Sequence, residues 1–158
     1  MPVISARQRS LFVYHLHMGG PDAGAVEWQA LLSPRFEARL NHMGLSVVHS
    51  AAEADVVLLT GVLTTHNMDA VFTELARMPS PSVLVAVGDS AINGGAWARL
   101  NLPGLAPYPL NHYVHVDVSV PGDPPTPQAL LAALAAAADA LARPDEHIAP
   151  WQEDEDGV

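Results

Sequence analysis

Three aspartates stand in turn-forming contexts where a carboxylate could do chemistry. Asp22, Asp89 and Asp123 each directly follow a glycine or a proline. If they converge, their oxygens would suit a hard cation such as Mg²⁺ or Ca²⁺. A second interpretation is a protonation site, in which Asp123 in a partly apolar pocket couples to proton movement in a partner. A third interpretation is that the turns carrying these aspartates do no chemistry, and that small residues with local hydrogen bonds fill the space between them. The residues alone leave all three open.

Ser90 and the glycine-rich stretch from Met18 to Gly24 are further candidates for chemistry. Each partly matches a known motif but lacks a feature that the motif requires. A nucleophile elbow requires a glycine two residues after the serine, where this chain has Ile92. A phosphate-binding loop needs backbone N–H groups, and Pro21 removes one. The chain also has no lysine. These departures disfavour a serine hydrolase, a P-loop and a dinucleotide site, and leave flavin mononucleotide only as a candidate by fold analogy.

The chain has eight histidines, but their spacing does not predict a metal site. His15 and His17 are two residues apart in an expected strand, and we expect their rings to face opposite sides of the sheet. The sequence contains no H-E-x-x-H motif. We therefore expect the histidines to be surface or packing residues.

Composition excludes several classes of protein. The 158 residues include seven arginines and 17 acidic residues, which gives a net charge of −10 and argues against a nucleic-acid partner. The absence of cysteine excludes thiolate zinc sites, cysteine nucleophiles and cysteine-ligated clusters. The most apolar runs are much shorter than the ~20 residues that span a bilayer. From these runs we expect a cytoplasmic chain.

Apolar runs separated by glycine and proline predict the elements that must position these residues. Strands are expected at residues 10–16, 45–48, 54–60, 82–87 and 114–120. Helices are expected at 26–40 with an interruption at Pro34, at 67–77, and at 126–143 with Thr126 as N-cap. This order predicts a three-layer α/β domain with a mainly parallel, flavodoxin-like sheet.

In such a sheet, ligands bind beyond the carboxyl ends of the strands. The segments there are the first loop (Met18–Gly24), the second loop (Gly61–Thr65), the third loop (Gly88–Gly95) and the fourth loop (Pro121–Pro125). We expect residues 10–143 to form this domain, residues 1–9 to be a leader, and residues 144–158 to be an acidic, disordered tail.

The loops also carry a combination of motifs. They are A-D-V-V-L-L-T-G at 54–61, V-G-D-S-A at 87–91, G-G at 94–95 and V-P-G-D-P-P-T-P at 120–127, preceded by H-L-x-x-G at 15–19. From about Phe12 to Leu141, the chain resembles the small subunit of energy-converting nickel–iron hydrogenases. It also resembles the related B subunit of NADH:quinone oxidoreductase (respiratory complex I). The H-L-x-x-G motif favours the hydrogenase small subunit over the complex I subunit.

The resemblance implies one [4Fe–4S] cluster held by four cysteines. The matching positions in this chain are Pro21, Gly24, Ser90 and Asp123. Proline and glycine offer no side-chain donor, and the oxygens of serine and aspartate suit an iron–sulfur cluster poorly. We therefore expect the fold and the assembly of the family without its cluster, and we expect no other cofactor.

The resemblance further implies a role as a subunit that is peripheral on the inner face of the cell membrane. The expected partners are a hydrogenase-large-subunit-like protein (the 49-kDa-type subunit of complex I) and ion-translocating membrane subunits. Without a cluster, the expected role is structural or conformational coupling, and catalysis by the chain alone is not expected. The alternative is an oxidoreductase subunit that binds quinone, flavin or another small ligand at the loop crevice. Trp28, Leu31, Leu32 and Phe36 are expected on the partner-facing or core face of the first helix.

Overall fold

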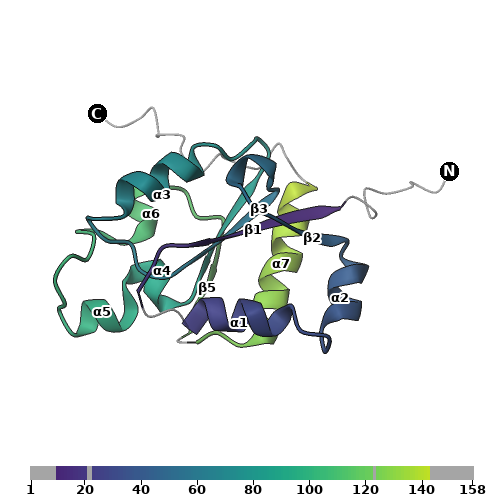
Figure 1. The fold of residues 1–158 in the computed structure, drawn as a ribbon, viewed down its shortest axis with the longest axis horizontal. Helices are drawn as coiled ribbons and strands as arrows, with labels where there is room; N and C mark the ends of the chain where they lie inside the picture. Colours follow the sequence, from purple (N-terminus) through teal and green to yellow (C-terminus); the bar gives the residue numbers. More distant parts are fainter. Residues whose placement is uncertain (1–9, 21–22, 123, 143–158) are drawn as a thin grey trace.

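The computed structural model describes residues 10–20, 23–122 and 124–142, and its centre is a five-stranded sheet (Figure 1). The strands lie in the order β2-β1-β3-β4-β5 and every pairing in the sheet is parallel. They are β1 (Leu11–His17), β2 (Leu45–Val48), β3 (Val56–Thr60), β4 (Val83–Val87) and β5 (Val118–Val120). This is the flavodoxin-like order, and it confirms the predicted fold class.

Helices cover both faces of the sheet (Figure 1). One face packs against α1 (Ala23–Leu31), α2 (Glu37–His42) and α7 (Pro127–Leu141). The other packs against α3 (Met68–Leu75), α4 (Asp89–Asn93) and α6 (Leu110–Tyr113). The remaining short helices are η2 (Ala51–Glu53) and α5 (Gly95–Arg99). The predicted three layers are thus present.

The sequence patterns explain why the central strands and the last helix form. All residues of β3 and β4 are buried, as expected of a continuous apolar run covered on both faces. In α7, Thr126 is the N-cap and its Oγ1 accepts a hydrogen bond from the Ala129 N–H at 3.1 Å. Pro127 occupies the first turn, where its missing N–H has no intrahelical partner to lose.

Two predicted boundaries were wrong. The first helix begins at Ala23, so Gly24 is helical although it was expected in a loop. The last strand holds only residues 118–120, because residues 110–113 form α6 and only the final residues pair with Val85–Val87 of β4. The expected interruption at Pro34 is present, since α1 ends at Leu31 and α2 begins at Glu37. No helix in the described residues is long and apolar enough to cross a membrane.

Candidate functional site

The first and second loops are bound tightly to each other. The Val62 N–H donates to the Gly19 carbonyl at 3.0 Å. The Asn67 side-chain amide donates to the carbonyl oxygens of Met18 and Val62 at 2.8 and 2.9 Å. Gly61 has a φ of +87°, and a Cβ atom there would lie 2.6 Å from the Gly19 oxygen, so only glycine fits this approach.

The third and fourth loops are joined through Asp89. The Asp89 N–H donates to the Gly122 carbonyl, and the Asp89 carboxylate accepts the Gly122 N–H, both at 2.9 Å. The Asp89 side chain therefore fixes the fourth loop. Asp22 and Asp123 lie outside the described residues, so the convergence of the three aspartates stays a prediction. Within the part of the chain that the structure describes, no three His, Asp or Glu residues are grouped to hold a metal ion.

Ser90 borders a small pocket. The pocket lies between the second loop, the third loop and the segment that contains α5 and α6. The pocket has a volume of about 220 Å³. Its lining is mainly apolar and includes Leu63, Ala91, Leu105 and Tyr108, with Ser90 and Asn93 as polar members. The Ser90 side chain also packs against Gly95, where a Cβ atom would lie 3.2 Å from Ser90 Oγ.

Of the four positions predicted to match cluster cysteines, two lie within the described residues. Ser90 is half-buried in α4 and Gly24 is buried in α1, whereas Pro21 and Asp123 lie outside. Because α1 and α4 cover opposite faces of the sheet, only its carboxyl edge could bring Gly24 and Ser90 together. An iron–sulfur cluster does not fit these residues: Gly24 has no side chain, Ser90 offers only a hydroxyl, and the chain has no cysteine.

The histidines of β1 overturn one expectation. His15 and His17 lie on the same side of the sheet, with ring centroids 6.2 Å apart, because side chains two residues apart in a strand share a face. His15 Nε2 lies 2.7 Å from Oγ1 of the buried Thr60 on β3. Its ring centroid is 6.4 Å from that of Trp28. The period of two was visible in the sequence and should have placed this pair together.

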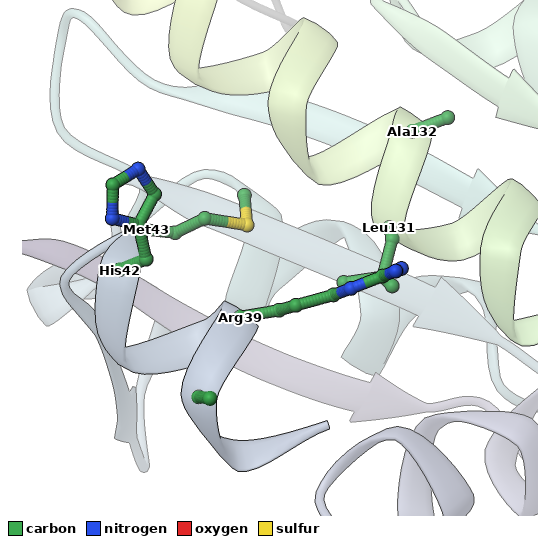
Figure 2. A pocket seen from close by; sticks show the side chains of 6 residues that line it. Arg39, His42, Met43, Leu131 and Ala132 are labelled. Carbon is green, nitrogen blue, oxygen red and sulfur yellow. The ribbon is translucent and has the colours of Figure 1, made fainter. Parts of the chain in front are cut away.

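A second hollow lies away from the loops, between α2 and α7 (Figure 2). It is open to solvent, and its volume is about 560 Å³. Its walls are mostly apolar, with Arg39 and His42 as the polar side chains; the lining residues are Ala38, Arg39, His42, Met43, Leu131 and Ala132. Arg39 extends from α2 toward Leu131 of α7 (Figure 2).

The apolar residues of the first helical region are mainly core. Trp28, Leu31 and Phe36 are buried in the cluster between the sheet and α7. Leu32 is 36% exposed and is the member of the set available at the surface.

Comparison with known proteins agrees with this architecture. Residues 22–137 match the family described as NADH ubiquinone oxidoreductase, 20 Kd subunit. The chain is 30% identical to the probable membrane-bound hydrogenase subunit mbhJ of Pyrococcus furiosus, over 94% of this chain and 86% of that protein. It is 32% identical to formate hydrogenlyase subunit 7 of Escherichia coli, over 94% of this chain and 56% of that protein.

Solved structures share the fold. A chain of the archaeal membrane-bound sulfane sulfur reductase superposes with a TM-score of 0.74 at 24% identity, covering 90% of this chain and 76% of that one. A chain of an NAD⁺-reducing [NiFe]-hydrogenase superposes with a TM-score of 0.64 at 21% identity, covering 89% and 96%. The family match extends over most of the sequence. This chain, which contains no cysteine, therefore belongs to the family of the 20-kDa subunit of NADH ubiquinone oxidoreductase.

Proposed function

We propose that this chain is a cluster-free small subunit of a membrane-associated, hydrogenase-like or complex I-like assembly. Its role there is structural, or it couples conformational change between a hydrogenase-large-subunit-like partner and an ion-translocating membrane module. The names of its relatives support membership of such an assembly, because they include a probable membrane-bound hydrogenase subunit and a formate hydrogenlyase subunit. The proposed setting is the inner face of the cell membrane.

One observation carries the proposal: hydrogen bonds join the described parts of the carboxyl-edge loops, yet the chain supplies no thiolate there. The loops are held by specific backbone contacts, including those of Gly61 with Gly19 and of Asp89 with Gly122. Electron transfer through the subunit needs a redox centre, and Ser90 and Gly24 offer no ligand suited to iron–sulfide. What such a subunit retains is a rigid edge against which partners pack.

The second candidate is an oxidoreductase subunit that binds quinone, flavin or another small ligand at the loops. The pocket beside Ser90 favours it, because it is apolar and has two polar side chains, Ser90 and Asn93. Its volume of about 220 Å³ is below the roughly 300–1,000 Å³ of typical ligand pockets. The pocket therefore suits a single small ring better than a whole flavin nucleotide.

Purification of the native complex through an affinity tag on this chain tests the two candidates. The expected result is co-purification of hydrogenase-large-subunit-like and membrane subunits, with no iron or acid-labile sulfide on this chain once it is separated from them. A chain that purifies alone with a bound flavin or quinone would overturn the subunit proposal and support the second candidate. Iron and sulfide on the separated chain would refute the cluster-free assignment.

A further inference from the structure

The open hollow between α2 and α7 combines apolar surface with exposed basic side chains (Figure 2). Leu131 is buried in the core cluster and Met43 packs against that cluster, whereas Arg39 and His42 are exposed on α2. The volume of about 560 Å³ lies within the roughly 300–1,000 Å³ of typical ligand pockets. The hollow therefore has room for a large aromatic side chain.

Arg39 gives the hollow its preference among ligands. Its side chain extends toward Leu131 (Figure 2), and among residues 10–20, 23–122 and 124–142 no Asp or Glu forms an ion pair with it. A guanidinium group binds carboxylates through paired N–H groups and also stacks on aromatic rings. Beside apolar surface, it favours a ligand that joins an aromatic group to carboxylates.

The chain carries a segment of this chemistry after α7. Residues 148–151 read I-A-P-W, and residues 153–156 read E-D-E-D. The other end of the chain is different, because residues 1–9 contain two arginines and no acidic residue. Charge complementarity with Arg39 therefore selects the C-terminal segment as the occupant.

The C-terminal segment is long enough to reach the hollow. Leu141, where α7 ends, lies about 15 Å along the helix from Leu131, since each helical residue rises about 1.5 Å. An extended chain from Leu141 to Trp151 spans up to about 30 Å. Trp151 can therefore return to the hollow without any movement of α7.

We propose that residues 144–158 dock in the hollow of their own chain, with Trp151 in its apolar part and the acidic run 153–156 beside Arg39. This gives a bound segment in place of the disorder expected from its composition. The docked segment fastens α2 to α7, which cover the same face of the sheet. The inference goes beyond the proposed function, which rests on the loops at the carboxyl edge.

Disulfide trapping in the full chain tests the docking, since the natural chain has no cysteine to interfere. The test variant is Gln152→Cys with Ala132→Cys, a position that lines the hollow. The matched control is Gln152→Cys with Ala70→Cys, because Ala70 is equally exposed but belongs to α3 on the other face of the sheet. Under mild oxidation, the test pair should close about tenfold faster or more, because docking raises its effective concentration.

Two substitutions in the test variant separate the apolar and the charged contributions. Trp151→Ala removes the aromatic anchor and should slow closure by about tenfold or more. Arg39→Gln removes one exposed charge and should slow it by about two- to fivefold. Arg77→Gln removes a positive charge at the end of α3 and should leave the rate unchanged. Circular dichroism establishes that each variant is folded.

Three outcomes would overturn the proposal. Equal closure rates for the test and control pairs would show that the segment has no preference for the hollow, and a rate unaffected by Trp151→Ala would remove its anchor. A disulfide that joins two molecules, at a rate that rises with protein concentration, would assign the hollow to a second copy. The proposed function is tested separately, because co-purifying subunits and iron content do not enter these rates.

Discussion

Asp89 and Gly122, 33 residues apart, exchange two hydrogen bonds: the Asp89 N–H donates to the Gly122 carbonyl and the Gly122 N–H donates to Asp89 Oδ1. The same arrangement joins Asp117 to Leu84 and Asp55 to Phe12. In each pair, an aspartate side chain accepts a backbone N–H of the neighbouring segment at an end of the sheet ladder. Asp89 is the member that lies at the candidate site.

Removing the Asp89 carboxylate should loosen the fourth loop. Asp89→Ala leaves the Gly122 N–H without its acceptor, and we expect a loss of about 1–2 kcal/mol in the free energy of unfolding. Asp89→Asn keeps an Oδ1 acceptor and should lose less than half as much. Urea unfolding measures both values. Equal losses in the two variants would mean that the charge, rather than this hydrogen bond, matters.

Cysteines at the four predicted ligand positions should confer cluster binding. In the variant with cysteine at positions 21, 24, 90 and 123, anaerobic reconstitution is expected to load iron and sulfide in the ratio of a [4Fe–4S] cluster, because thiolates are the ligands that iron–sulfur clusters require. Metal analysis and visible absorption measure the loading. The unaltered chain should take up neither element.

The matched control for that experiment carries four cysteines at exposed helical positions away from the loops: Ala52, Ala70, Ala135 and Ala136. It should load no stoichiometric cluster. Equal loading of the two variants would show that thiols alone suffice, and would withdraw the assignment of positions 21, 24, 90 and 123.

Gly61 should be much less tolerant of a methyl group than Gly104. Both have a φ near +88°, but a Cβ atom at Gly61 would meet the Gly19 oxygen, whereas one at Gly104 has no atom within 4 Å. Gly104→Ala should therefore cost about 1–2 kcal/mol for its backbone conformation alone. Gly61→Ala adds overpacking and should cost about 3 kcal/mol or more in total. Similar losses by urea unfolding would contradict the close approach of the two loops.

Glu74 should make stability depend on pH in the acidic range. Its pKa is lowered from 4.5, first by the hydrogen bond from the Ala51 N–H and also by Arg77, which lies 2.9 Å away. A lowered pKa in the folded state means that the ionised group stabilises the fold above pH 4.5. This contribution is lost as the pH falls through that value and below it.

Glu74→Gln should therefore lower the Tm at pH 7, and the difference from the unaltered chain should shrink as the pH falls below 4.5. Thermal unfolding at several pH values measures this. Glu53→Gln, at an exposed position, serves as the control for removal of one negative charge. A difference that stays constant from pH 7 to acid would refute the assigned role of Glu74.

Much of the fold could be predicted from local pattern. The runs Val56–Thr60 and Val83–Val87 are continuously apolar and were recognisable as central strands, because only a strand covered on both faces needs such a run. The alternating residues 114–120 were misleading. Alternation of apolar and polar residues indicates that a segment can be extended. It does not indicate how many residues pair with a neighbouring strand, and here only the three residues Val118–Val120 pair with β4.

Some features of the candidate site could be predicted from the sequence, and others could not. The absence of thiolate chemistry follows from the sequence alone, because no fold can supply a side chain that the chain lacks. The contact of His15 with Thr60, 45 residues away, and the pairing of Asp89 with Gly122 were decided by the tertiary structure. Strand order and register bring these residues together, and both depend on packing between segments that are distant in the sequence.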